Sequence, residues 1–328
     1  MSFFGQLLKR VVYALILLLA VLVLNFVLLH LAPGDPADVI AGEMGGATEE
    51  MMASIRATYG LDRPFYVQLY TYVAKVFHAD LGYSFYFDRP VTELILDRLG
   101  PTILLVVSSL LLAVFVGTLL GVMAAQRPNG IVSHLVTVLA LIGYALPVFW
   151  TGIMLVILLA SVFPLFPVSG MRDMVGDDAS GLAYVLDVLH HLALPVLTLS
   201  TIYLAFYSRL SRASMLDVLG ADYVRTARAK GLSETVVVYK HALRNAVLPV
   251  ITFAGLQFSG LFSGAVLVET VFSWPGLGSL AYDSILRRDS PTLLGILFFS
   301  ALIVVVVNLL TDLAYRLVDP RIKAGVST

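Results

Sequence analysis

Six long stretches of this chain contain no Asp, Glu, Lys or Arg, and they constrain its fold more than any other feature. A helix needs about 20 apolar residues to cross a bilayer, and in lipid only helices and closed barrels satisfy all backbone hydrogen bonds. The fourth stretch is short for a crossing, and Pro195 near its start marks either a kink or a first-turn proline. We predict an all-α integral membrane protein with six transmembrane helices, at residues 11–31, 102–126, 135–163, 192–208, 247–268 and 292–311.

The composition agrees with a membrane protein. Of the 328 residues, 59% are hydrophobic and 13% are charged, whereas soluble domains contain about 25% charged residues. The chain has no cysteine, which excludes a disulfide framework and a thiolate metal site. We divide the chain into an N-terminal tail with the first span (1–31), an external cap segment (32–101) and a core membrane domain with the other five spans (102–328).

The distribution of charge predicts the orientation. With the N-terminus inside, the inner segments carry thirteen Lys and Arg against five Asp and Glu, which gives +8 inside and −9 outside. The positive-inside rule then places both termini in the cytoplasm. Lys9 and Arg10 precede the first span as they would precede a signal peptide. We expect it to be retained, because it is too long for an h-region and residues 32–36 do not form a small-x-small cleavage site.

The segment 222–241, DYVRTARAKGLSETVVVYKH, is polar and basic and lies between two predicted spans. Asp222 favours a helix start, Gly231 favours its end, and Ser233 can cap a second short helix. One face of the first helix would carry Tyr223, Val224 and Ala227. Two short helices with an apolar face suit another protein's groove, although a solvated basic loop that obeys the positive-inside rule needs no partner.

Residues 222–233 and 241–249 (HALRNAVLP) resemble the EAA loop of ABC importer permeases, specifically of the dipeptide/oligopeptide/nickel branch. In that family the loop docks on the ATP-hydrolysing subunit. The resemblance implies a coupling loop at residues 209–246, between the fourth and fifth spans. The ATPase-coupling residues that it implies are Asp222, Tyr223, Arg225, Ala227, Arg228, Gly231, Leu232, Ser233, His241 and Arg244.

The loop departs from the general family motif, which reads Glu-Ala-Ala, three residues, Gly, nine residues, then Ile-x-Leu-Pro. Arg225 and Thr226 stand where the Glu and the first Ala would be, whereas Ala227 and Gly231 match. At the position of Ile-x-Leu-Pro, His241 replaces Ile, and Leu243-Arg244 replaces Leu-Pro. The first-position Glu is therefore not carried over, and the departures are similar to those of the peptide branch itself.

The resemblance covers nearly the whole chain and is to the B-type permease subunit of that branch. It implies a permease subunit of an ATP-driven importer of peptides or similar small solutes, in the bacterial cytoplasmic (inner) membrane. The implied partners are a second, homologous permease in a heterodimer, two cytoplasmic ATPase subunits, an external substrate-binding protein and membrane lipid. No catalytic residue or cofactor is expected in this chain, and ATP and Mg are expected on the ATPase subunits. The further segments that carry the resemblance are residues 31–36, 59–64, 79–84, 145–150, 269–278 and 317–322.

Polar and small residues within the predicted spans have two interpretations each. Gln257 either lines a solute pathway, with Ser259 and Ser263, or bonds to a neighbouring helix. Glycines at 117 and 121, and at 260 and 264, form small-xxx-small pairs that predict close helix contacts, although glycine is common in membrane helices.

Two segments outside the spans contain many aromatic residues. The external segment has aromatic and apolar residues at near-helical spacing between 59 and 73, which favours a small folded cap or a helix lying on the membrane. The loop 269–278 either gates the outer mouth or is a turn in the aromatic belt. Its candidate gate residues are Phe272, Trp274, Pro275 and Gly276.

Other function classes find little support. A channel or secondary carrier whose basic loop binds lipid head groups remains the alternative, although no series of carboxylates or histidines crosses the spans as a proton relay would. His190, His191 and Asp187 offer an incomplete metal-ligand set, so we expect interfacial histidines and no metal. No nucleophile elbow or Walker loop is present. Nucleic-acid binding through the turn at Gly231 is not expected, because that turn lies between two spans.

Overall fold

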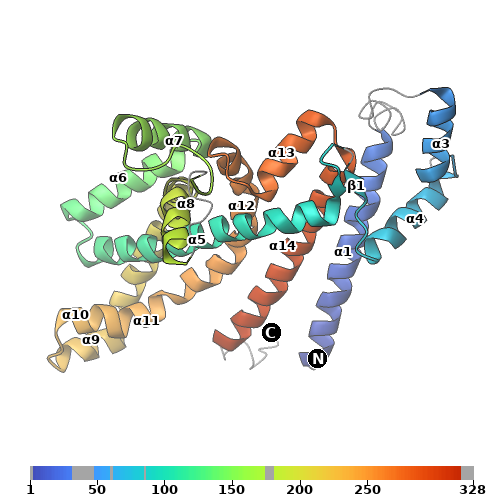
Figure 1. Cartoon of the computed structure of the whole chain (residues 1–328). Helices are drawn as coiled ribbons and strands as arrows, with labels where there is room; N and C mark the ends of the chain where they lie inside the picture. The colour runs from blue at the N-terminus through green and yellow to red at the C-terminus, as the bar shows by residue number, and fades with distance from the viewer. Residues whose placement is uncertain (1–2, 32–47, 60–61, 85, 174–180, 319–328) are drawn as a thin grey trace. The chain divides into compact units, whose positions relative to one another are not determined.

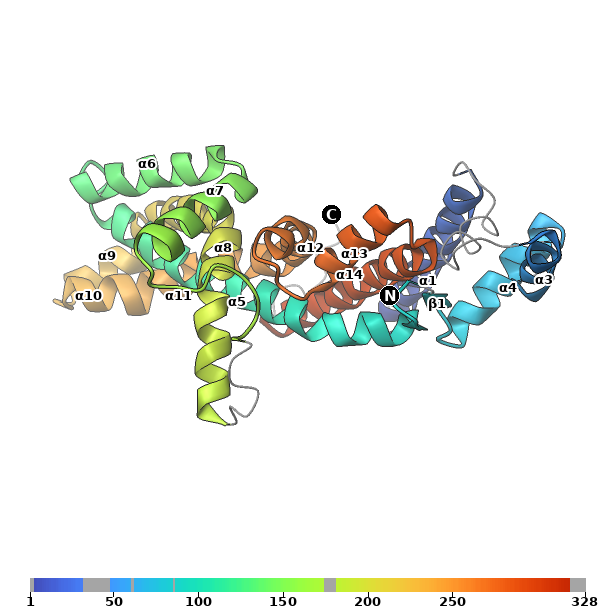
Figure 2. The same ribbon diagram turned by 45° about the horizontal axis from the view of Figure 1, so that its top comes forward.

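The computed structural model describes residues 3–31, 48–59, 62–84, 86–173 and 181–318, which are almost entirely helical (Figures 1 and 2). Of the segments that carry the resemblance, residues 32–36, 60–61 and 319–322 lie outside the described residues. The chain forms two compact units, one of residues 1–100 with 280–312, the other of residues 101–279 with 313–328.

The first unit contains the N-terminal helix and the segment that follows it. Its α4 packs on α1, where Tyr72 stacks on Phe26 with ring centroids 5.7 Å apart. Burial raises the pKa of Tyr72 to about 12. Phe65 also contacts Phe26, with ring centroids 5.1 Å apart. Tyr66, Tyr70 and Phe77 are exposed, so this helix has features of both predicted alternatives. The elements are α1 (Phe3–Leu31), α3 (Glu49–Tyr59), α4 (Phe65–Phe77), antiparallel β1 (Tyr83–Ser84) and β2 (Arg89–Pro90), the start of α5 (Val91–Gln126) and most of α14 (Ser290–Val318).

The second unit contains the rest of α5 and a bundle around α8, against which α6, α7 and α12 pack (Figure 2). A short helical segment joins α8 to α12. The bundle elements are α6 (Ile131–Ala145), α7 (Val148–Leu155) with the π-helical Val156–Val162, α8 (Leu182–Leu219), α12 (Leu248–Val271) and the start of α13 (Leu277–Arg287). The joining segment consists of α9 (Asp222–Ala229), α10 (Glu234–Val236), the π-helical Val237–Ala242 and α11 (Leu243–Ala246).

Among the described residues, five helices are long and apolar enough to cross a membrane, or six if one bent pair is a single span. The bent pair is the predicted third span, which turns by 107° between Ala145 and Val148. Pro147 lies in this break, where its ring and missing N–H oppose a continuous helix. The predicted fourth span is the middle of the 38-residue α8, and Pro195 lies inside that helix and not in its first turn.

The first predicted small-residue pair is a close helix contact between α5 and α8. A Cβ added at Gly121 would lie 2.5 Å from the Ser208 carbonyl oxygen, and one at Gly117 would lie 2.8 Å from the Tyr207 Cβ. The second pair is looser, since a Cβ at Gly264 would meet only a Leu199 methyl at 3.4 Å. Only glycine permits the first contact without a shift of the backbone.

Candidate coupling site

In the segment 222–246, the first helix begins and ends as predicted, and the second helix differs from the prediction. Asp222 begins α9, and the chain turns at Gly231, whose φ of +75° favours glycine. Ser233 occupies the N-cap position of α10 through its backbone, but its side chain makes no capping hydrogen bond. From α10 the chain continues through the π-helical turn into α11, so the second helix runs on to residue 246.

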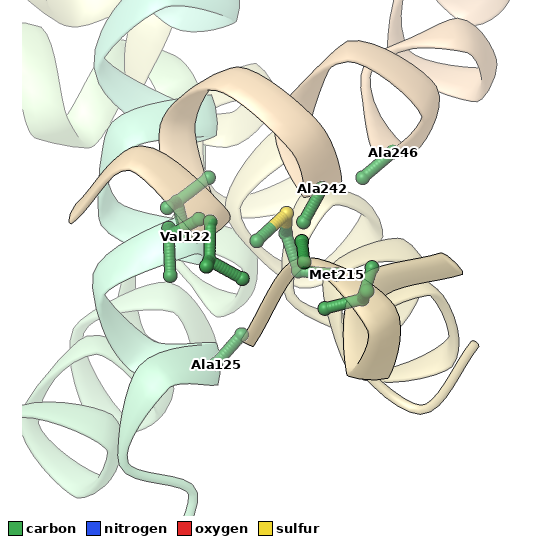
Figure 3. Close-up of a cluster of buried hydrophobic side chains, with 9 residues drawn as sticks. Val122, Ala125, Met215, Ala242 and Ala246 are labelled. Atoms are coloured by element: carbon green, nitrogen blue, oxygen red, sulfur yellow. The ribbon is translucent and has the colours of Figure 1, made fainter. Parts of the chain in front are cut away.

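One buried cluster fixes this segment to the ends of two bundle helices (Figure 3). Val122 and Ala125 come from the last turns of α5, and Met215 comes from α8. Val224 and Ala227 lie three residues apart and therefore share the inward face of α9. The segment's own members of the cluster are Val224, Ala227, Val237, Val238, Ala242 and Ala246.

The outward face of α9 and the following turn is charged and exposed. Tyr223 does not join Val224 and Ala227 as predicted; its ring is exposed, and its hydroxyl accepts a hydrogen bond from the Asn245 amide at 2.8 Å. Of the coupling residues that the resemblance implies, Ala227 alone is buried and His241 is half-buried. The others are exposed, namely Asp222, Tyr223, Arg225, Arg228, Gly231, Leu232, Ser233 and Arg244.

Arg228 joins α9 to α10. Its guanidinium donates two hydrogen bonds to the Glu234 carboxylate, at 3.1 and 2.7 Å. The hydrogen bond from Arg228 holds the pKa of Glu234 below its usual range. Because both side chains are exposed, the pair contributes little stability. Its geometric effect is to fix the angle between two short helices at Gly231.

The segment is covalently continuous with two long helices. Two residues, Gly220 and Ala221, separate α8 from α9, and a single residue, Val247, separates α11 from α12. A displacement of the exposed face must therefore move the adjoining ends of both helices. Since α12 has 24 residues, it carries that displacement over about 36 Å.

A buried carboxylate organises the loop at the far end of α12. Glu269 is fully buried, and its Oε2 accepts the backbone N–H groups of Gly278 and Ser279 at 2.7 and 3.1 Å, so it caps the start of α13. Its Oε1 accepts the Thr102 hydroxyl at 2.7 Å. A Cβ at Gly276 would overlap the carboxylate, which explains the glycine there.

The aromatic residues of this loop are buried inside the protein. Phe272 and Trp274 are at most 1% exposed, and the indole N–H donates to the Pro101 carbonyl at 2.9 Å. An aromatic-belt turn would place its rings at the membrane surface, so that alternative does not fit this loop. Pro275 is half-buried beside the buried Gly276. The pattern of residues 269–278 did not reveal that hydrogen bonds of Glu269 and Thr102 fix this loop.

The candidate pathway residues lie along α12 and not in one cluster. Gln257 and Ser259 are half-buried, and Ser263 is exposed with its hydroxyl donating to the Ser259 carbonyl at 3.3 Å. The two serines share one helix face, whereas Gln257 points elsewhere on the helix. Pathway lining by these three residues stays a prediction.

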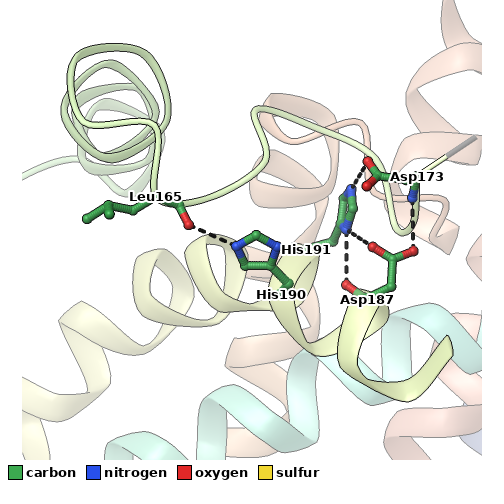
Figure 4. A network of polar contacts seen from close by, with 5 residues as sticks. All are labelled: Leu165, Asp173, Asp187, His190 and His191. Atoms are coloured by element: carbon green, nitrogen blue, oxygen red, sulfur yellow. Dashed lines mark hydrogen bonds and ion pairs between the residues drawn. The ribbon is translucent and has the colours of Figure 1, made fainter. Parts of the chain in front are cut away.

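The two histidines before the fourth apolar stretch have different environments (Figure 4). His190 is exposed and its Nε2 lies 2.8 Å from the Leu165 carbonyl, whereas His191 is buried beside Asp187. The structure also brings Asp173 to His191. Sequence spacing gave no signal for this third group, because Asp173 precedes Asp187 by 14 residues across a connector without a motif.

Comparisons with known proteins identify the family to which this chain belongs. A family model for the binding-protein-dependent transport system inner membrane component matches residues 117–324, and a model for the N-terminal part of such membrane components matches residues 3–106. The dipeptide transport system permease protein DppB of Escherichia coli (strain K12) is 43% identical over 321 residues, covering 93% of this chain and 94% of that protein. The oligopeptide transport system permease protein AppB of Bacillus subtilis (strain 168) is 39% identical, with coverages of 97% and 99%.

A solved structure has the same fold over most of the chain. A chain of the MetNI methionine ABC transporter, in an inward-facing conformation, matches with a TM-score of 0.55 at 16% identity and covers 69% of this chain and 96% of its own length. The family models together reach from residue 3 to residue 324. This chain belongs to the family of binding-protein-dependent transport system inner membrane components, the permease subunits of ABC importers.

Proposed function

We propose that this chain is the membrane-spanning subunit of an ATP-driven importer of peptides or similar small solutes, driven through residues 222–241. The observation that carries the proposal is the two-sided α9. Its apolar face is buried against α5 and α8, and its other face, with the turn at Gly231, is exposed and charged. The relatives that are named as dipeptide and oligopeptide permeases support the class of solute.

The proposed partners follow from the family and from the exposed surface. Two cytoplasmic ATPase subunits that bind ATP and Mg would receive α9 and the turn, a second homologous permease would complete the membrane channel, and an external binding protein would deliver the solute. Both termini and the coupling segment would then lie in the cytoplasm of a bacterial cell. The Lys and Arg excess on these segments agrees with that orientation.

The mechanism uses the continuity of the helices. When the ATPase subunits close on ATP, they would move α9 as a block with α10 and α11, because the buried cluster and the Arg228–Glu234 pair hold these elements together. α8 and α12 would transmit the movement through the membrane. At the far end of α12, Glu269 and the loop that it holds would shift with the helix and gate the solute.

Peptide uptake into vesicles tests the proposal. Vesicles that contain this chain with its co-expressed partners should import a radiolabelled dipeptide only when ATP is supplied. Leu232→Asp, on the exposed turn, should lower uptake at least about tenfold, because a docked apolar side chain contributes about 1.5–3 kcal/mol. Uptake that persists without the ATPase subunits would overturn the proposal in favour of a channel or secondary carrier.

A further inference from the structure

The first unit contains a cavity between α1 and α14. Its volume is about 180 Å³, whereas a single water needs about 10–15 Å³. The residues that line it are Arg10, Tyr13 and Ala14 of α1 and Val305, Asn308 and Leu309 of α14. None of these six residues belongs to the coupling segment or to the loop around Glu269. The cavity therefore has room for a chemical group, and its lining has no part in the proposed transport mechanism.

The cavity lies where two candidate membrane spans end. The span in α1 begins at Leu8, and the span in α14 ends at Thr311. Arg10 and Tyr13 lie in the first two turns of the one span, and Asn308 lies one turn before the end of the other. The two helices therefore bring polar side chains to one border of the apolar layer, where the head groups of phospholipids lie.

The polar part of the lining suits a phosphate group. Arg10 is half-buried, and Tyr13 and Asn308 are exposed. A guanidinium presents five N–H donors in a fixed fork, so it can bind two phosphate oxygens and keep the interaction that Arg10 already has within the chain. The Tyr13 hydroxyl and the Asn308 amide can donate to the same group. Among the six described lining residues none is acidic, so the lining has a net positive charge.

Lys9 adds a second cation beside the cavity. Its Nζ lies 5.7 Å from the centroid of the Tyr13 ring, within the range of a cation–π contact. The Lys9 side chain is itself exposed. Two neighbouring cations at the border of the apolar layer attract anionic head groups more strongly than zwitterionic ones.

The rest of the lining and the surface beyond it are apolar. Ala14, Val305 and Leu309 are half-buried. Leu17 follows Tyr13 by one turn on the same face of α1 and is 50% exposed. A soluble anion would gain nothing from these apolar contacts, whereas a lipid can place its acyl chains against them. The ligand that fits both parts is an amphiphile with a negative head.

We propose that this cavity binds an anionic phospholipid whose phosphate contacts Arg10, Tyr13 and Asn308. Lys9 and Arg10 neutralise the head group, and the acyl chains lie along α1 and α14. One Lys or Arg near an anionic lipid surface strengthens binding about fivefold, so two cations predict about a 30-fold preference for an anionic over a zwitterionic lipid. The bound lipid joins the N-terminal helix to α14.

Lipid titration followed by native mass spectrometry tests the site. The full-length chain, purified with its co-expressed partners and delipidated, is titrated with phosphatidylglycerol or with phosphatidylcholine. We expect phosphatidylglycerol to bind about 30-fold more tightly, and inorganic phosphate at the same concentration not to displace it. Arg10→Gln and Lys9→Gln should each lower this preference about fivefold. Asn308→Leu should weaken the binding of both lipids, because it removes a donor to the phosphate that both contain.

Arg63→Gln is the matched control, because it removes the same charge from an exposed residue that does not line the cavity. This variant should keep the preference of the parent protein. Since Lys9 is exposed, Lys9→Gln remains informative even if Arg10→Gln fails to fold. Equal affinity for the two lipids, an equal loss of preference in Arg63→Gln and Arg10→Gln, or displacement of phosphatidylglycerol by inorganic phosphate would each overturn the proposal.

Discussion

Adding the same charge to two neighbouring residues of α9 separates the anchoring of this helix from its exposed surface. Ala227 is 6% exposed within the cluster that joins α9 to α5 and α8. Thr226 is exposed, and its hydroxyl donates to the Asp222 carbonyl of the same helix. Replacing Ala227 by Glu therefore places a carboxylate in the buried cluster, and replacing Thr226 by Glu places one on the exposed surface.

The magnitudes decide what Ala227→Glu does. α9 buries Val224 and Ala227, and a buried Val with one further methyl contributes about 2–4 kcal/mol. An unpaired carboxylate in such a cluster costs several kcal/mol or more. Detachment of α9 therefore costs less than burial of the charge, and a helix of eight residues is unstable alone. We expect α9 to detach while the bundle stays folded.

Hydrogen–deuterium exchange of the purified protein measures this detachment. Loss of about 2–4 kcal/mol should speed the exchange of the α9 amides about 30- to 700-fold, since 1.4 kcal/mol is a factor of ten. Thr226→Glu should change it by no more than about twofold, as surface substitutions do. Equal exchange in the two variants would refute the inference that the buried face holds α9.

Four further predictions concern other contacts, three of them tested by substitutions and one by pH. Gly121→Ala should lower the free energy of unfolding by about 1–3 kcal/mol, because its Cβ would meet backbone atoms of α8. Gly264→Ala should change the free energy of unfolding by no more than about 0.5 kcal/mol. Equal unfolding temperatures of the two variants would contradict the close packing at Gly121. Glu269→Ala should cost about 2–5 kcal/mol, because two backbone N–H groups lose their acceptor, and an unfolding temperature like that of the parent protein would exclude the capping role. Arg228→Glu should reduce uptake, and a second change, Glu234→Arg, should restore it. Because the pKa of Glu234 in the folded state is lowered, this pair is intact at neutral pH and is lost only as the pH falls below about 4.5. Uptake that depends on the pair should therefore not vary between pH 6 and 8.

Absence of charge located the membrane helices in the sequence but not their ends. The predicted fourth span began at residue 192, whereas α8 begins at Leu182, because a helix continues through polar residues once it leaves the apolar layer. α5 likewise begins at Val91, before the predicted residue 102. The third stretch lacks charge throughout, so hydropathy could not show the break, although Pro147 within it is a local signal for one.

Within the candidate site, the sequence predicted the parts that depend on local chemistry. Gly231 ends the first helix because the left-handed conformation at this position favours glycine. Ala227 is buried because its spacing from Val224 places both residues on the same face of α9. Contacts between distant residues could not be predicted. Glu269 reads as the polar end of a span until the structure places it against Thr102, 167 residues earlier.

Labelling of one introduced cysteine tests the central claim that the 222–241 segment docks on the ATPase subunits. The chain has no native cysteine, and Ser233 is exposed on the turn, so Ser233→Cys gives a single accessible thiol. A membrane-impermeant maleimide should label it only from the cytoplasmic side, and co-expressed ATPase subunits should protect it. Labelling from the outside would contradict the orientation, and cytoplasmic labelling that the ATPase subunits leave unchanged would contradict coupling through this segment.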